Sequence, residues 1–276
     1  MNDKSYKAKV MESALFLKEK TSINPEIGIL AGTGLGDCAD SVKTDFEIKY
    51  DDIPNFPVST VESHEGKLIF GTLNGKEIIV MQGRFHLYEG YTPLEVTFPV
   101  RVMQEMGVGS LIVTNASGGL NLTFNEGDIM IITDHVNLTG SNPLTGQNVD
   151  SWGLRFPDMI NAYDKKLVDL AFEKGKSLSI QIQKGIYAGL PGPVLETPAE
   201  MRYLKTIGCD AVGFSTIHEV ITGVHAGMKI LGLSVIANIN DPENPEPATL
   251  ESVVSVMQGT AGKVDQLISS ILKDSF

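Results

Sequence analysis

The sequence predicts an α/β protein built on a parallel or mixed sheet, and three observations indicate it. Short apolar runs such as residues 111–113 lack polar alternation, which is typical of strands buried on both faces. Segments with helical periodicity lie between these runs. Several of the runs end abruptly in glycine and small polar residues, at the position where open α/β sheets bind ligands.

The chain has 276 residues and no linker-like stretch, so we expect a single domain over residues 1–276. Its formal net charge of -12 argues against binding to nucleic acid or to anionic membranes, but not against a small anionic substrate. Residues 1–20 are charged throughout, and Cys38 and Cys209 form no CxxC pair. We therefore expect a cytoplasmic protein with free thiols and no structural zinc.

The N-terminal part is expected to begin with an amphipathic helix over residues 3–20, followed by an apolar strand over residues 27–31. That strand continues into Gly32-Thr33-Gly34-Leu35-Gly36. A strand that ends in glycines suits a phosphate cradle, because the backbone can approach an anion closely. The segment is not the GxGxxG dinucleotide fingerprint, since its third glycine comes one residue too early, and a plain tight turn is the alternative.

A β-hairpin is predicted over residues 67–72 and 77–82, because Asn74-Gly75 between them is the strongest short hairpin signal. Arg84 and His86 follow the second strand and lie two residues apart. In an extended segment both side chains would face the same way, and arginine offers a planar donor fork for phosphate. The alternative is a surface loop with incidental polar residues.

The central segment, residues 110–121, is predicted to be a buried strand followed by a ligand-binding loop over residues 114–119. Two glycines and small hydroxyls in that loop can surround an anion, although a strand followed by a simple turn is the alternative. A helix over residues 92–106 precedes this segment, and a strand over residues 128–133 follows it. Residues 138–158 form a long loop of the kind that usually serves function.

The C-terminal half is expected to alternate helices with strands. Thr197 and Glu200 form a capping box with Pro198 at the first helical position, which predicts the start of a helix. Glu196 lies just outside that helix and is left without a structural role. Residues 241–247 contain three prolines and are expected to form a surface loop. The remaining predicted elements are helices over residues 162–176, from about 217, and over 250–272, and strands over residues 182–190, 209–214 and 230–236.

Neither a metal site nor covalent catalysis is predicted. The five histidines show no HExxH or similar ligand spacing. The sequence contains no Gly-x-Ser-x-Gly elbow, and neither cysteine lies in a nucleophile signature.

Five segments occur in an order that resembles the trimeric purine nucleoside phosphorylases. They are GTGLG (32–36), GRFHLYEG (83–90), TNASGG (114–119), GPVLETPAE (192–200) and AVGFST (211–216). Each motif alone is weak, whereas the ordered set is specific, and the similarity extends over about residues 25–270. The resemblance implies a mixed sheet with a partly closed, distorted barrel surrounded by helices.

The resemblance also implies an activity and an assembly. The family cleaves purine nucleosides with inorganic phosphate, giving the free base and ribose 1-phosphate in purine salvage. Phosphate is a co-substrate, and no metal or organic cofactor is implied. A homotrimer is implied, with no nucleic acid or membrane as a partner.

The resemblance assigns residues to the three parts of the substrates. The phosphate would be bound by Thr33, His64, Arg84, His86, Ala116 and Ser215. The ribose would lie against Tyr88, Phe214 and Leu250, and Phe156 would reach in from a neighbouring subunit. The purine would be held by Leu195, Glu196, Val212 and Asn238. The catalytic set would be Asn238, Glu196 and His86.

Glu196 and Asn238 favour 6-oxopurine (deoxy)ribonucleosides such as inosine and guanosine. Glu196 can accept a hydrogen bond from N1–H, and the Asn238 amide can stabilise the leaving purine through N7. The nearest rival activity is phosphorolysis of 5'-methylthioadenosine or 5'-methylthioinosine. The methylthioadenosine enzymes carry aspartates at positions 238 and 240 and lack the glutamate at 196. A non-catalytic nucleotide-binding module is the third reading.

Three positions depart from the family pattern. Leu195 replaces a phenylalanine, and Ser117 replaces an alanine and could add a donor to the phosphate loop. Leu250 occupies the place of a histidine that binds the ribose 5'-hydroxyl. Leucine there indicates an apolar pocket, but the loop before it could shift the register and leave Leu250 in the core, or His218 could supply the missing donor.

Overall fold

The structure is a computed structural model that describes residues 5–32, 41–58 and 66–275. Within these residues nine strands form one sheet in the order β2-β3-β4-β1-β5-β8-β7-β6-β9. Their bounds are β1 Ile27–Ala31, β2 Lys43–Lys49, β3 Lys67–Leu73, β4 Lys76–Gln82, β5 Ser110–Gly119, β6 Ile129–Asn137, β7 Ile182–Gly189, β8 Ala211–Gly213 and β9 Lys229–Ile239.

The sheet closes on itself because β5 also pairs with β9. The strands β5, β8, β7, β6 and β9 therefore form a closed five-stranded barrel, and β1 to β4 extend from it as an outer sheet. Parallel and antiparallel pairings both occur, since β5 pairs parallel with β1 and β9 but antiparallel with β8. The predicted α/β fold with a mixed sheet and a partly closed barrel is confirmed.

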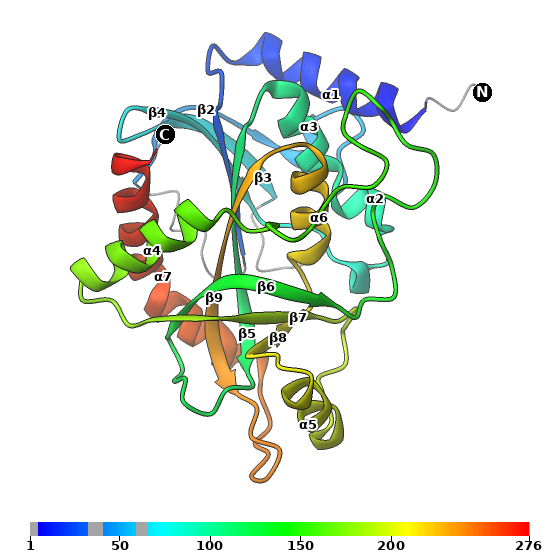
Figure 1. Ribbon diagram of the computed structural model, residues 1–276. Coiled ribbons are helices and arrows are strands. Elements are labelled where there is room, and N and C mark those ends of the chain that lie inside the picture. Colours follow the sequence, from blue (N-terminus) through cyan, green and yellow to red (C-terminus); the bar gives the residue numbers. More distant parts are fainter. Residues whose placement is uncertain (1–4, 33–40, 59–65, 276) are drawn as a thin grey trace.

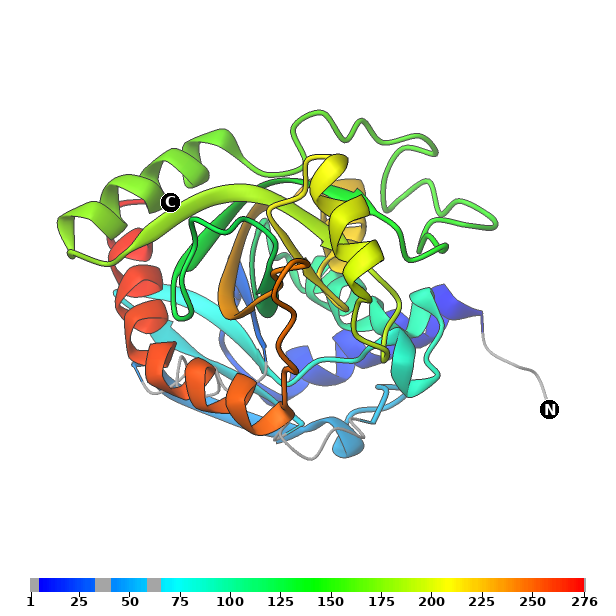
Figure 2. The same ribbon diagram turned by 90° about the horizontal axis from the view of Figure 1, so that it is seen from below.

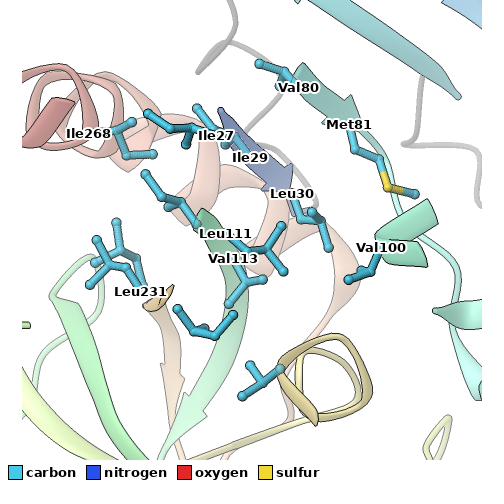
Figure 3. Packing of buried hydrophobic residues seen from close by; sticks show 14 of the residues in the cluster. Ile27, Ile29, Leu30, Val80, Met81, Val100, Leu111, Val113, Leu231 and Ile268 are labelled. Carbon is cyan, nitrogen blue, oxygen red and sulfur yellow. The ribbon is translucent and has the colours of Figure 1, made fainter. Parts of the chain in front are cut away.

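Helices cover the sheet on two sides, as Figure 1 shows: α4 and α7 lie together on one side, and α1, α3 and α6 lie on the other. Figure 3 shows apolar side chains of β1, β4, β5 and β9 packed between Val100 of α3 and Ile268 of α7, both of which are buried.

None of the helices in the described part of the chain is long and apolar enough to cross a membrane. The helices are α1 Tyr6–Lys20, α2 Pro93–Val96, α3 Phe98–Met106, α4 Lys165–Ser177, α5 Pro198–Thr206, α6 Ile217–His225 and α7 Leu250–Asp274, with short 3-10 turns at Tyr50–Asp52 and Leu87–Glu89.

The predicted hairpin is confirmed as the antiparallel pair β3 and β4. Asn74 and Gly75 have φ angles of 52° and 81°, which is the left-handed pair that a two-residue turn between twisted strands requires. Strand β2 pairs with β3 and was not predicted. Its sequence, KTDFEIK, is mostly exposed and charged, so it carries no apolar signal for a buried strand.

The prediction of a loop over residues 114–119 was wrong, because β5 continues to Gly119. β9 pairs with it along its whole length, and β8 pairs with Gly118 and Gly119. Strands β6 and β9 likewise extend beyond their predicted ends, to Asn137 and Ile239. The polar ends of these strands are therefore part of the barrel wall: the end of β6 pairs with β7, and the end of β9 pairs with β5.

A bulge in β9 shapes the end of the barrel. Ser117 is opposite Ile236, whereas Gly118 is opposite Asn238, so Ala237 is an extra residue in β9. Such a bulge bends a strand and changes the direction of the side chains that follow it. It places Asn238 at the mouth of the barrel.

The helix predicted over residues 92–106 is divided into α2 and α3 at Thr97. Pro99 has no N–H to donate to the carbonyl of Glu95 four residues earlier, which explains the interruption. The capping box of Thr197 and Glu200 is confirmed at the start of α5, with Pro198 in its first turn. The predicted closing helix is confirmed as α7, which begins at Leu250.

Candidate active site

Two adjoining cavities open at one end of the barrel. The larger has a volume of about 610 Å³ and the smaller about 110 Å³, and Tyr88, Ala116 and Phe214 line both. The segment that follows β9 passes across this end of the molecule in Figure 2, and its residues 245–250 line the larger cavity. The carboxyl ends of β5, β8 and β9 supply much of the remaining wall.

The smaller cavity gathers hydrogen-bond donors. Of the residues predicted to bind phosphate, Arg84, His86, Ala116 and Ser215 all line it. The other two, Thr33 and His64, lie outside the described residues. A guanidinium, an imidazole and a hydroxyl around so small a space can bind a phosphate-sized anion.

Arg84 is held rigidly at the floor of this cavity. Its Nη2 donates to the carbonyl of Thr114 at 2.7 Å, and its Nη1 donates to Thr216 Oγ1 at 3.1 Å. Nη1 also lies 3.8 Å from Glu219 Oε1, and both of these side chains are 2% exposed. The charge of Arg84 is thus compensated inside the protein, on the side away from the cavity.

The residue that links these groups has an unusual backbone. Thr216 has a φ of 77°, in the left-handed region that β-branched residues rarely adopt. Its hydroxyl oxygen accepts from Arg84 and also from Asn115 Nδ2 at 2.7 Å. This strained residue is the N-cap of α6, so its hydroxyl links the start of the helix that carries Glu219 to Asn115 of β5, beside the smaller cavity.

A buried chain of hydrogen bonds continues into the barrel. Ser234 Oγ donates to Asn115 Oδ1 at 2.6 Å, and Ser117 Oγ lies 2.6 Å from Ser234 Oγ. Because the Ser234 hydroxyl gives its proton to Asn115, the Ser117 hydroxyl donates to Ser234. The expectation that Ser117 adds a donor to a phosphate loop was therefore wrong, since its proton is used inside the barrel.

His86 is oriented by a carboxylate. Its Nδ1 lies 2.8 Å from Glu89 Oε1, and the same oxygen accepts from the His86 backbone N–H at 2.8 Å. The imidazole stacks on Tyr88 with ring centroids 4.6 Å apart, and Tyr88 meets Phe214 edge to face. Tyr88 and Phe214, which the family resemblance assigns to the ribose, line both cavities at their junction.

The larger cavity carries the polar residues predicted for the purine. Glu196 and Asn238 line it together with Leu195 and Val212. Burial raises the pKa of the Glu196 carboxyl, although a hydrogen bond from Asn240 opposes this. A carboxylate acceptor and an amide between apolar walls can form hydrogen bonds with the polar edge of a flat heterocycle.

Asn240 was not predicted as a site residue, although it lies between the two that were. Its Nδ2 donates to Glu196 Oε2 at 3.0 Å, and its Oδ1 accepts from Asn238 Nδ2 at 2.6 Å. The spacing of two residues between Asn238 and Asn240 at a strand end was the available signal, because such residues face the same way. In the sequence, the pair distinguishes 6-oxopurine nucleosides from methylthioadenosine as substrates, without giving Asn240 a role of its own.

Three further predicted positions have different outcomes. Leu250 lines the larger cavity and is 72% exposed, so it is not a core residue. His218 is buried, with Nε2 3.0 Å from Ser141 Oγ, and is not among the described residues that line either cavity. In this position it binds Ser141 rather than facing the cavity that Leu250 lines. Phe156 is 84% exposed and lies outside both cavities of its own chain.

Over the described residues, no group of three or more histidine, cysteine, aspartate or glutamate side chains could hold a metal ion. Burial raises the pKa of the Cys209 thiol to about 11, so this side chain is a poor nucleophile at neutral pH.

Comparison with known proteins identifies the family. The family model described as "Phosphorylase superfamily" matches residues 26–273. The chain belongs to the phosphorylase superfamily.

Relatives within this superfamily match nearly the whole chain. It is 50% identical over 266 residues to purine nucleoside phosphorylase 1 of Bacillus subtilis, covering 96% of this chain and 98% of that protein. The structure of Schistosoma mansoni purine nucleoside phosphorylase in complex with inosine matches with a TM-score of 0.93 and 40% identity, covering 98% and 97% of the two chains. The complex of the Schistosoma mansoni enzyme with adenosine matches with a TM-score of 0.92 and 41% identity, covering 97% of each chain.

The buried ion pair gives a stability prediction. Glu219→Leu leaves the charge of Arg84 buried without its carboxylate, and removing one partner of such a pair costs about 3–5 kcal/mol. We expect the free energy of unfolding, measured by urea denaturation, to fall by that amount. The control is Glu173→Leu on α4, whose partner Lys176 is 3.9 Å away at an exposed site, and which should cost less than about 1 kcal/mol. Equal losses in the two variants would contradict this account of Arg84.

Proposed function

We propose that this protein is a purine nucleoside phosphorylase that cleaves 6-oxopurine (deoxy)ribonucleosides with inorganic phosphate. The proposal takes residues 1–276 as one catalytic domain that acts in cytoplasmic purine salvage. The observation that carries it is that the smaller, donor-lined cavity adjoins a larger cavity lined by the Glu196 carboxylate and the amides of Asn238 and Asn240. The names of the relatives that match over nearly the full chain support the same activity.

The proposed reaction needs the two cavities to adjoin. A phosphate oxygen attacks C1' of the ribose while the C1'–N9 bond breaks, and the electron pair of that bond leaves with the purine. In the net reaction hydrogen phosphate loses one proton and the purine gains one, so the products are ribose 1-phosphate and the neutral base. Positive charge develops on the sugar between the two, as in other glycosyl transfers, and the phosphate dianion stabilises it.

The positions of the described side chains support the proposed roles. Arg84, His86 and Ser215 bind phosphate at the smaller cavity, with Ala116 in its wall, and the family resemblance adds Thr33 and His64. Tyr88 and Phe214 hold the ribose at the junction. Leu195 and Val212 pack on the purine, Glu196 accepts from N1–H, and Asn238 interacts with N7.

The alternatives explain less of this arrangement. A non-catalytic nucleotide-binding module needs an anion site, but it would not need Arg84 and His86 together with Glu196 and Asn238. A methylthioadenosine phosphorylase would present a base with an unprotonated N1 to the Glu196 carboxylate. Two acceptors facing one another in a buried site are unfavourable.

The first prediction concerns phosphate. Release of hypoxanthine from inosine should require inorganic phosphate, because phosphate is the nucleophile, and ribose 1-phosphate should appear in equal amount. A coupled assay for hypoxanthine, run with and without phosphate, measures this. Equally fast release of the base in phosphate-free buffer would identify a hydrolase instead.

The second prediction concerns the base. Inosine and guanosine should have higher kcat/KM than adenosine, since Glu196 needs an N1–H, and Glu196→Gln should lower kcat/KM for inosine about 10–100-fold through loss of a charge-assisted hydrogen bond. Glu243→Gln is the matched control, because its carboxylate binds the exposed Arg202 instead. An adenosine kcat/KM comparable to that of inosine would contradict the assignment. Because the Schistosoma mansoni enzyme has been crystallised with adenosine bound, the test must compare turnover and not binding.

The third prediction concerns assembly. Leu154, Phe156 and Ile160 are 76%, 84% and 85% exposed on one loop, and so large an apolar exposure is explained by burial in a neighbouring subunit. We expect a homotrimer by light scattering at assay concentration, with Phe156 completing the adjacent site. Phe156→Ala should lower kcat/KM, whereas Leu122→Ala, an exposed apolar residue elsewhere, should not. A fully active monomer would contradict this prediction.

The fourth prediction concerns Leu250, which together with Val253 and Pro247 gives the larger cavity an apolar rim. Leucine cannot bind the ribose 5'-hydroxyl, so 5'-deoxyinosine or 5'-methylthioinosine should be turned over within a few-fold of inosine. Leu250→His should restore a preference for the hydroxyl of up to about tenfold, the value of a neutral hydrogen bond. If the wild type lost a hundredfold in kcat/KM on removal of the hydroxyl, another residue would have to bind it.

A further inference from the structure

Asn240 lies between Glu196 and Asn238, which both line the larger cavity: its Nδ2 is 3.0 Å from Glu196 Oε2 and its Oδ1 is 2.6 Å from Asn238 Nδ2. It is 7% exposed, and its backbone N–H donates to the carbonyl of Gly119 at 2.8 Å. Its side chain fills the space beside Gly118, where a Cβ atom would lie only 2.6 Å from Asn240 Nδ2. The position of Asn240 is therefore fixed by its backbone and by the lack of a side chain at Gly118.

The charge of Glu196 determines the direction of these hydrogen bonds. An ionised carboxylate only accepts, so the group of Asn240 that faces it is the amide nitrogen. The amide oxygen of Asn240 then faces Asn238, and the group of Asn238 that meets it is again the nitrogen. Asn238 is left with its Oδ1 and one remaining N–H for the cavity that it lines.

We propose that Asn240 is a positioning residue that fixes the amide of Asn238 with its oxygen available to the N7 edge of the purine. The proposal rests on the proposed function. In that reaction N7 carries a lone pair in the nucleoside and gains a proton as the C1'–N9 bond breaks. An oxygen at this edge accepts a hydrogen bond from the new N7–H. The flipped amide would instead place its own N–H against N7–H, so that two donors would face each other.

The consequence is a difference between substrates. An oxygen that accepts from N7–H assists only a purine that becomes protonated at N7. In 7-methylinosine the N7 position is already methylated and the base is cationic, so its departure needs no proton there. Loss of Asn240 should therefore slow the cleavage of inosine while leaving that of 7-methylinosine nearly unchanged.

The test compares kcat for these two nucleosides at saturating phosphate. In Asn240→Leu, which removes both hydrogen bonds at similar volume, we expect kcat for inosine to fall at least about tenfold, the value of one to two hydrogen bonds. The kcat for 7-methylinosine should change less than about threefold, and the KM for phosphate should not change. Asn244→Leu is the matched control, because that amide is exposed and binds only Asp241 among the described side chains.

A second variant tests the direction of the hydrogen bonds. An aspartate at 240 still accepts from Asn238 Nδ2, but it opposes the Glu196 carboxylate, which contacts both nucleosides. Asn240→Asp should therefore slow both reactions while keeping the inosine to 7-methylinosine ratio nearer to the wild type than leucine does. If Asn240→Leu fails to fold, Asn240→Ser takes its place, since serine is too short to reach both partners.

Equal losses of kcat on the two nucleosides would overturn the proposal, because Asn240 would then only shape the cavity. Unchanged kcat for inosine in Asn240→Leu would overturn it as well. A wild-type protein that cleaves neither nucleoside would instead refute the proposed function, which is a different result from either of these.

Discussion

Arg84 carries its positive charge into a site that is almost closed to water, and Glu219 compensates for that charge at 3.8 Å. Burial of two such groups is costly, and hydrogen bonds from the two terminal nitrogens of Arg84 to Thr114 and Thr216 offset part of that cost. The contacts tie the end of β4 to β5 and to the start of α6. Because these segments are far apart in the sequence, the anion cavity exists only when the whole sheet is assembled.

Closure of the barrel through β5 and β9 also positions polar residues near the two cavities. The long pairing of β5 with β9 brings Ser117 and Asn115 against Ser234, so the polar strand ends are satisfied within the barrel. The extra residue Ala237 then turns the end of β9 outward to the mouth. The polar residues of the two cavities thus lie together at one end of the barrel.

The fold class and most elements could be predicted from the sequence, because they depend on local patterns. The turn at Asn74 and Gly75 needs left-handed backbone that those residues supply, and the cap of α5 is formed within four residues. The extension of β5 and the presence of β2 could not be predicted, since each depends on a partner strand distant in sequence. The same holds for the candidate site. Arg84 and Glu196 were found by residue type and resemblance, whereas Thr216, Glu219 and Asn240 matter through contacts that only the folded chain reveals.

A crystal structure with phosphate and hypoxanthine bound would test the central claim most directly, which is that the two adjoining cavities hold the two halves of one reaction. We predict phosphate within hydrogen-bonding distance of the Arg84 guanidinium and the Ser215 hydroxyl. Hypoxanthine should lie between Leu195 and Val212 with N1 against Glu196 and N7 toward Asn238. Phosphate bound away from Arg84, or a base bound outside the cavity of Glu196 and Asn238, would contradict the account.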